Sequence, residues 1–316
     1  MAKNNTKNDS YIAYLDFVGT KNSVSINEEL YNISIKRILF ELKKLSKKYT
    51  DVQSTMLSDS VFLSSHNQEI FSLLRELRVN LFTYSIYFTC AVQKGTLDLS
   101  SHADDGTTPT NLNYFTLGNP DTVKVFAKQS VLKGIGIDIS PLAGSLPKKD
   151  YVTSYYFFND NLVEFKDLSY TNPANASIDM ILNNFRIHID SIFRESNIQS
   201  MTNSNATKYY LTPFISLLTC ALEGNHNITK DIFKITFELF DKPHFKENHY
   251  ILCMYAYLIN LRLKYNDDNE LNNDFIKANK NNAFFKELIR NLNQIPYHLL
   301  SLQNKKTISE IIYSIS

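Results

Sequence analysis

The spacing of apolar residues changes once along this chain of 316 residues, and that change limits the possible folds more than any other feature. Before Thr171-Asn172-Pro173, short apolar runs typical of strands alternate with segments whose apolar residues recur at helical spacing. After this turn, helical spacing continues alone. We therefore predict a disordered stretch over residues 1–9, an α+β domain over residues 10–170 and an all-α domain over residues 176–316.

The elements expected before the turn follow the order β-α-ββ-α-ββ-α-ββ, which around one sheet is the ferredoxin-like plan with additions. Helices are predicted over residues 27–48 and 67–84, on either side of a hairpin over residues 52–65. The polar segment 100–113 is rich in turn formers and predicts a loop or a protruding arm. Beyond the turn, Thr212-Pro213 is expected to begin one of several helices, which show no repeat of fixed period and so favour a helical bundle.

Composition excludes some partners. With 33 basic and 32 acidic side chains the formal net charge is +1, which argues against a general electrostatic grip on nucleic acid or on an anionic membrane. Cys90, Cys220 and Cys253 are set in apolar runs, which is typical of buried thiols in a reducing compartment. The longest apolar run, residues 250–259, is shorter than the roughly 20 residues that span a bilayer, and the polar start predicts neither a signal peptide nor an anchor. We expect a cytoplasmic protein that binds neither membranes nor nucleic acid.

Two aspartates occupy positions where a purely structural residue is unusual. Asp16 interrupts the apolar run 11–18, and Asp59 stands at the tip of the expected hairpin between Ser58 and Ser60. A lone buried carboxylate is costly unless a cation compensates its charge. If the two strands are neighbours, both carboxylates converge on one point, where they could hold two Mg²⁺ or Mn²⁺ ions about 3.5 to 4 Å apart over a triphosphate. The alternative is that Asp16 caps the following turn and Asp59 closes the hairpin, and the spacing alone leaves both interpretations open.

The segments YLDFVGT, LSDSVFLS, QKGTLDLS and GNPDTVKVFAK follow one another over about residues 10–160. In this order they resemble the successive motifs of class III nucleotidyl cyclases, and more specifically of the pyrimidine cyclases of bacterial antiphage (Pycsar) signalling. The separation of Asp16 and Asp59 is close to that between the two metal-binding aspartates of this family. Nothing after residue 170 contributes to the resemblance.

The resemblance implies a metal and phosphate site at the end of the first strand. Asp16 and Asp59 would bind two Mg²⁺ or Mn²⁺ ions per site. The turn Phe17-Val18-Gly19-Thr20 would offer a carbonyl, that of Phe17, to metal and its N–H groups to the phosphates.

Positive charge at the site would come from lysines. Lys94 stands where many relatives have an arginine before a glycine, so it is a candidate phosphate contact, with a solvated strand lysine as the alternative. Where many relatives carry an asparagine and an arginine that stabilise the transition state, this chain has Thr122 and Phe126. Lys124 and Lys128, four residues apart on the same predicted helix, could supply that charge, although an ordinary exposed helix face fits them equally well.

The base preference is inferred from two further positions. Purine-specific relatives usually read the base with a lysine before the second metal aspartate and with a polar residue before the glycine of the later motif. The same offsets here hold Thr55 and Phe115. A hydroxyl and an aromatic wall suit a smaller ring, so we expect UTP to be used before CTP, unless Phe115 is simply part of the core.

The function expected from the resemblance is intramolecular cyclisation of a nucleoside triphosphate by a head-to-tail homodimer with shared sites. The product would act on a downstream cyclic-nucleotide-sensing effector in antiphage defence, and the helical part would sense or regulate. One alternative is a catalytically degenerate cyclase-like module that binds a nucleotide as a sensor. Another is a two-metal nuclease or polymerase-like enzyme, which the near-neutral charge disfavours.

Overall fold

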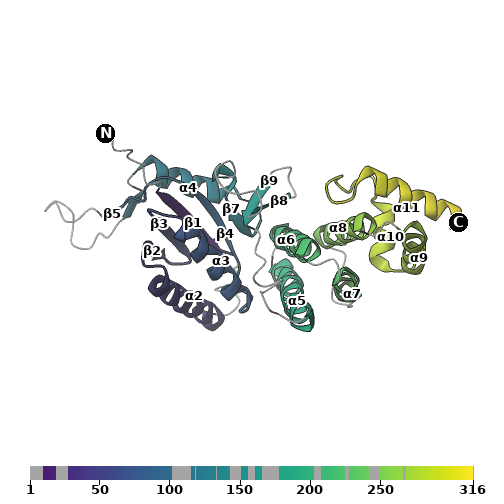
Figure 1. The fold of residues 1–316 in the computed structure, drawn as a ribbon, viewed down its shortest axis with the longest axis horizontal. Coiled ribbons are helices and arrows are strands. Elements are labelled where there is room, and N and C mark those ends of the chain that lie inside the picture. The colour runs from purple at the N-terminus through teal and green to yellow at the C-terminus, as the bar shows by residue number, and fades with distance from the viewer. Residues whose placement is uncertain are drawn as a thin grey trace, which may run out of the picture. The chain divides into compact units, whose positions relative to one another are not determined.

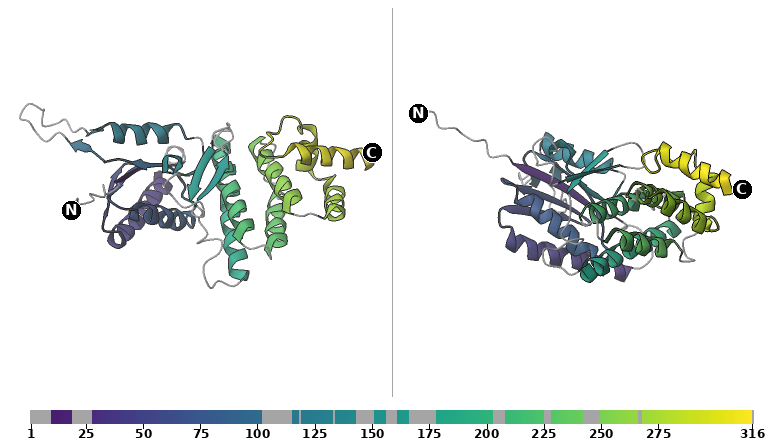
Figure 2. Two further views of the ribbon diagram at one scale, coloured as in Figure 1. Left: turned by 45° about the horizontal axis from the view of Figure 1, so that its top comes forward. Right: turned by 45° about the vertical axis from the view of Figure 1, so that its right-hand side comes forward.

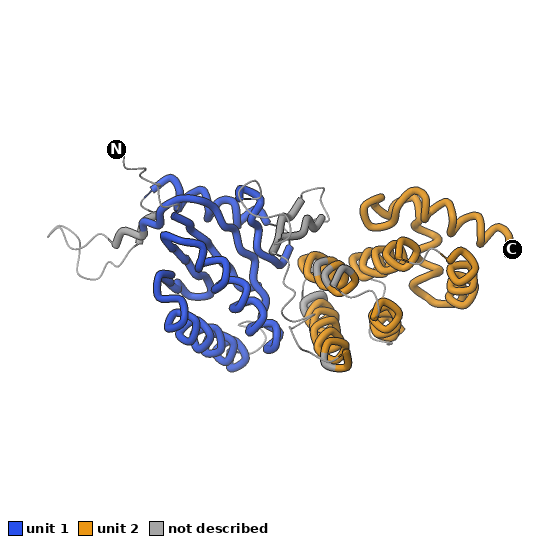
Figure 3. The backbone as a smooth tube through the Cα atoms, in the orientation of Figure 1, with its two compact units in different colours: residues 1–154, 161–166 blue, residues 155–160, 167–316 orange. Residues whose placement is uncertain are grey.

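The computed structural model describes residues 10–18, 28–101, 115–117, 119–132, 134–142, 151–155, 161–165, 178–202, 208–224, 228–241, 249–265 and 268–315. The chain divides into two compact units, residues 1–154 with 161–166 and residues 155–160 with 167–316 (Figure 3). Within the described ranges, no helix combines the length and the apolar character needed to cross a membrane.

The first unit is built on a five-stranded sheet in the order β2-β3-β1-β4-β7 (Figure 1). Its strands are β1 (Tyr11–Phe17), β2 (Val52–Leu57), β3 (Ser60–Ser65), β4 (Phe88–Lys94) and β7 (Gly136–Asp138). Neighbouring strands are antiparallel except for the parallel pair β4 and β7. With helices α2 (Glu28–Lys48) and α3 (Glu69–Phe82), the first four strands form a βαββαβ unit with the ferredoxin-like strand order. The predicted α+β class of this unit is confirmed.

Further elements extend this core. Helix α4 covers Pro120–Ser130, and a short 3₁₀ turn covers Ser140–Leu142. Two small two-stranded sheets are formed by β5 (Leu99–Ser101) with β6 (Phe115–Leu117) and by β8 (Tyr151–Tyr155) with β9 (Asn161–Phe165). Most of the segment 100–113 lies outside the described residues, as do residues 1–9.

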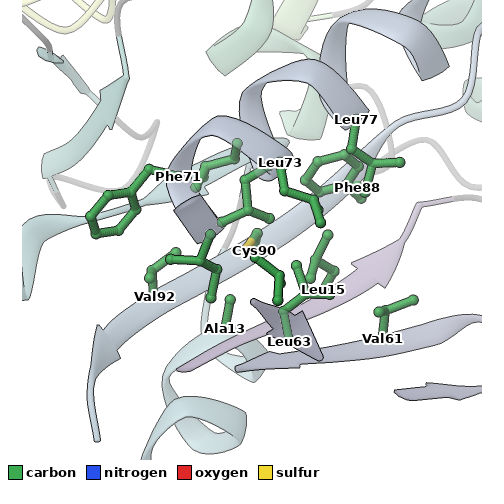
Figure 4. Packing of buried hydrophobic residues seen from close by; sticks show 14 of the residues in the cluster. Ala13, Leu15, Val61, Leu63, Phe71, Leu73, Leu77, Phe88, Cys90 and Val92 are labelled. Atoms are coloured by element: carbon green, nitrogen blue, oxygen red, sulfur yellow. The ribbon is translucent and has the colours of Figure 1, made fainter. Parts of the chain in front are cut away.

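The two faces of β1 carry different layers of side chains, because successive residues of a strand point to opposite faces. Ala13 and Leu15 belong to the main core, which packs against α2 and α3 and is shown in Figure 4. Ile12 and Tyr14 face the other side, where they meet Val125 of α4. Helices α2 and α3 therefore cover one face of the sheet and α4 covers part of the other, as Figure 2 shows. Asp16 follows Ile12 and Tyr14 at the period of two and so belongs to the α4 face.

The elements described over residues 178–315 are helices. They are α5 (Ile178–Thr202), α6 (Lys208–Gly224), α7 (Thr229–Phe240), α8 (His249–Tyr265), α9 (Asn269–Asn279), α10 (Ala283–Arg290) and α11 (Leu302–Ile315). Aromatic rings from four of them meet edge to face in the core, namely those of Phe193, Phe214, Phe240 and Tyr255. The predicted helix start at Thr212-Pro213 is wrong, because α6 begins at Lys208 and contains Pro213.

Candidate functional site

The two candidate aspartates lie at the same end of neighbouring strands. In the register of β1 and β3, Asp16 stands opposite Ser60, the residue that follows Asp59. The N–H group of Phe17 donates to the main-chain carbonyl of Asp59 over 3.1 Å. The condition under which both carboxylates could serve one site, that their strands are adjacent, is therefore met. Both side chains are partly buried.

A tight turn presents Asp59. Leu57 pairs with Ser60, which leaves Ser58 and Asp59 as a two-residue hairpin turn. Ser58 adopts a positive φ of 57°, as the first position of a favoured two-residue turn requires. Such a conformation is unfavourable for a residue with a side chain, so the hydrogen-bonded strands on both sides must hold it.

The end of β1 is fixed on both sides. While Phe17 bonds to Asp59, the N–H group of Val18 donates to the carbonyl of Tyr87 over 2.9 Å. Both N–H groups are thus used within the sheet. Any phosphate binding by this turn is left to the N–H groups that follow, and Gly19 and Thr20 lie outside the described residues.

A chain of hydrogen bonds reaches Asp16 across the sheet. The Ser60 hydroxyl donates to Asp16 Oδ1 over 3.0 Å, and the Tyr14 hydroxyl donates to Ser60 Oγ over 3.0 Å. Burial raises the pKa of the Tyr14 phenol, the Ser60 hydrogen bond lowers it in part, and the charges of Asp16 and Asp59 raise it further. Both carboxylates thus raise the pKa of the same phenol.

The sequence interpretation missed Tyr14 and Ser60. A signal was present, since Tyr14 precedes Asp16 by two residues and must share its face of the strand. The pairing of Asp16 with Ser60 was not available, because it depends on the register of β1 against β3.

The donor set fits a hard divalent cation. It offers two carboxylates, which are oxygen ligands of the kind that Mg²⁺ and Mn²⁺ prefer. Among the described residues, histidine, cysteine, aspartate and glutamate nowhere form a group of three or more that could hold a metal ion. Two carboxylates suffice for Mg²⁺ that is bound together with substrate phosphates, since such sites usually take one or two carboxylates from the protein.

Lys94 is far from the aspartates within one chain. It ends β4 opposite Tyr11, whereas Asp16 stands opposite Thr89. Five residues of strand separate Lys94 from Thr89, which at about 3.4 Å per residue is roughly 17 Å. The following Gly95 has a positive φ of 153°, and a Cβ atom there would lie 2.8 Å from atoms of the Asp121 side chain. The glycine of this motif thus lets β4 approach the start of α4.

The lysines of α4 differ in their surroundings. Lys128 Nζ lies 2.9 Å from Asp138 Oδ2 and donates to Ser140 Oγ over 2.8 Å, so it ties α4 to the buried carboxylate of β7. Lys124 is exposed. Thr122, at the offset of the family's asparagine, is fully buried and bonds to the helix cap Asn119.

The two candidate base contacts are placed unequally. Thr55 on β2 stands opposite Phe62 on β3, and Phe62 in turn stands opposite Tyr14 on β1. Residues directly opposite each other share a face, so Thr55 lies on the sheet face that carries Tyr14 and Asp16. Phe115 begins β6, and its side chain lies outside the described part of the structure.

Comparison with known proteins does not identify a family for this chain. No protein-family model matches the chain, and no curated protein matches it. Among solved structures, the chain is similar to the crystal structure of the guanylyl cyclase Cya2, with 10% sequence identity over 54% of this chain and 96% of that chain and a TM-score of 0.36. A similarity of this size carries no argument about activity.

Proposed function

We propose that the first unit is a nucleotidyl cyclase, which converts a pyrimidine nucleoside triphosphate, UTP before CTP, to a 3′,5′-cyclic monophosphate and pyrophosphate. The observation that carries this proposal is the placement of Asp16 and Asp59 at one end of adjacent strands, where Phe17 bonds to the main chain of Asp59 over 3.1 Å. The motif resemblance supports the reaction class, and the adjacency of the two aspartates supports the proposed metal site.

In the proposed reaction, the ribose 3′-oxygen attacks the α-phosphorus, the bond to pyrophosphate breaks, and the 3′-hydroxyl proton passes to solvent. Two Mg²⁺ or Mn²⁺ ions bound there would help to activate the attacking oxygen and to neutralise the leaving pyrophosphate. Asp16 and Asp59 would hold them through their carboxylates, together with the main-chain carbonyl of Phe17. Val18 is already bonded within the sheet, so Gly19 and Thr20 would provide the N–H groups for the phosphates.

The proposed site is shared by two copies in a head-to-tail homodimer. Within one chain, Lys94 stands at the opposite end of the sheet from Asp16, and an antiparallel arrangement of two sheets brings these ends together. Lys94 of a second copy would then contact the phosphates. Lys124 and Lys128 would add positive charge, and we expect Lys124 to contribute more because Lys128 is already paired with Asp138.

The proposed base preference rests on Thr55 and Phe115. Thr55 lies on the same sheet face as Tyr14 and Asp16, and its short hydroxyl side chain could bond a carbonyl of a single-ring base. Phe115 would stack on that base. A downstream effector would sense the cyclic nucleotide in antiphage defence.

The deciding experiment incubates the purified protein with each of the four nucleoside triphosphates and Mn²⁺ and detects cyclic mononucleotides by mass spectrometry. Cyclic UMP in excess of cyclic CMP is the expected result, and it should vanish in Asp59→Ala. Faster cyclisation of ATP or GTP would refute the base preference but leave the cyclase proposal intact.

A second candidate is a nucleotide-binding sensor without catalysis. It is favoured by the burial of Thr122 and by Phe126, which occupy the offsets of the family's transition-state residues. Nucleotide binding without any cyclic product would identify this alternative.

A further inference from the structure

Tyr14 is held in one orientation by aromatic neighbours on two elements. Its ring centroid lies 4.5 Å from that of Phe62 on β3 and 5.1 Å from that of Phe126 on α4. The side chain is buried, with 8% of its surface exposed. A buried ring in contact with two others has little freedom at its side-chain torsions, so its hydroxyl is presented at a fixed point on the sheet face.

The direction of the hydrogen bonds beyond this ring is determined by Ser60. A serine hydroxyl has one proton to donate, and here it donates to Asp16 Oδ1. The same oxygen accepts from Tyr14, which leaves the serine proton pointing to the carboxylate. Hydrogen bonds arranged head to tail polarise one another, and each strengthens the next.

We propose that Tyr14 is a positioning residue for the candidate metal site, which acts through Ser60 to fix the carboxylate of Asp16. This inference rests on the proposed function, because it requires Asp16 to bind a divalent cation. A carboxylate has about four lone-pair sites, so the serine hydroxyl can fix its plane without filling its capacity for a cation.

The main chain of Asp16 is also held in place, by hydrogen bonds from β4 and α4. Gln129 of α4 donates to Thr89 Oγ1, and Thr89 in turn donates to the main-chain carbonyl of Asp16 over 3.5 Å. Helix α4 thus reaches Asp16 through Gln129 and contacts Tyr14 through Phe126. Residues outside β1 therefore donate hydrogen bonds to both the side chain and the main chain of Asp16. Metal ligands are usually oriented by such outer hydrogen bonds.

The experiment measures Mn²⁺ affinity of the purified full-length protein, by the electron paramagnetic resonance signal of free Mn²⁺. The variants are Tyr14→Phe, Ser60→Ala and the double variant. Two variants serve as matched controls. Tyr11→Phe removes a phenol hydroxyl on the opposite face of β1. Ser64→Ala removes a serine hydroxyl on the same face of β3, four residues beyond Ser60. Thermal unfolding of each variant establishes that it is folded.

We expect Tyr14→Phe to weaken Mn²⁺ binding about threefold to tenfold, the effect of one neutral hydrogen bond. Ser60→Ala should weaken it about tenfold or more, as the loss of a partner to a metal ligand usually does. The double variant should bind no more weakly than Ser60→Ala, because Tyr14 acts through Ser60. The control variants should bind like the parent protein.

Three results would overturn the inference, and they are distinguishable. Unchanged affinity in a folded Tyr14→Phe protein would show that the phenol does not position Asp16. Independent losses that multiply in the double variant would show that Tyr14 does not act through Ser60. A parent protein that binds no Mn²⁺ in the absence of nucleotide would refute metal binding by Asp16 in the free protein, which this inference requires, whereas the proposed function is tested separately by the cyclisation assay.

Discussion

Asp16 lies in an apolar strand and accepts a hydrogen bond from Ser60. These two features determine the expected effect of its replacement on cyclisation. Asp16→Asn keeps the size of the side chain and an oxygen that can accept from Ser60, but it removes the negative charge. Cyclisation should fall at least about a hundredfold, since a bound metal contributes several kcal/mol to the transition state. Product formation by mass spectrometry measures this loss, and an equally active variant would contradict the assignment.

The Tyr255 hydroxyl offers a test of stability in the second unit. It is fully buried, and among the described residues it has no hydrogen-bond partner. Burial accordingly raises its pKa. Tyr255→Phe should raise the free energy of unfolding by about 1 kcal/mol, because it removes a polar group that is buried without a partner.

Tyr257 is the matched control on the same helix. Its hydroxyl is hydrogen-bonded to that of Thr219 over 2.8 Å. Tyr257→Phe should therefore lower the free energy of unfolding by about 1 kcal/mol. Chemical denaturation compares the two variants, and equal destabilisation by both would contradict the distinction.

At the scale of elements, the β2–β3 hairpin depends on the positive φ of Ser58. Ser58→Gly should be neutral or slightly stabilising, because glycine adopts this conformation without steric strain. Ser58→Val should lower the free energy of unfolding by about 1 kcal/mol or more, since a β-branched side chain tolerates positive φ poorly. Urea denaturation measures both. Equal stability of the two variants would show that the turn does not impose this conformation.

The sequence predicts those elements that depend on local signals and not those contacts that depend on residues far apart in the chain. The run 11–17 and the hairpin around Asp59 were predicted, because apolar composition and turn residues act locally. The bonds of Tyr14 to Ser60 and of Lys128 to Asp138 were not, because they depend on strand register and on the parallel pairing of β7.

At the start of α6, the burial of large side chains outweighs the preference of proline for the first turn of a helix. Proline favours the first turn of a helix and lacks an N–H group, so the sequence predicts a start near Pro213. The structure begins α6 at Lys208, and Tyr210, Leu211 and Phe214 on either side of Pro213 are buried. Burial of these large side chains, each contributing roughly 1.5 to 3 kcal/mol, offsets the lost hydrogen bond.

At the scale of the whole molecule, the proposed shared site predicts complementation between inactive chains. One chain carries Asp16→Ala with Asp59→Ala, and the other carries Lys94→Ala with Lys124→Ala. Each alone should be inactive, whereas an equal mixture should recover up to about a quarter of the parent activity, because half of the dimers are mixed and each has one intact site. A mixture of two chains that both lack the aspartates is the control. No recovery, with mixed dimers demonstrated, would exclude a shared site.

The helical unit makes a separate prediction. We expect it to restrain or position the proposed cyclase dimer until a phage-derived signal arrives. Removal of residues 176–316 should then change the amount of cyclic nucleotide in infected relative to uninfected cells. A folded, dimeric truncated protein with unchanged activity in both would contradict a regulatory role.

The central position of β1 has a consequence for amide hydrogen exchange. This strand is bonded to β3 on one side and to β4 on the other along its length, up to the N–H groups of Phe17 and Val18. Amides in such a strand exchange with solvent deuterium only through the rarest and largest openings of a domain. The peptide groups that carry Asp16 should therefore be among the slowest to exchange, so the carboxylate stands on the part of the unit that fluctuates least.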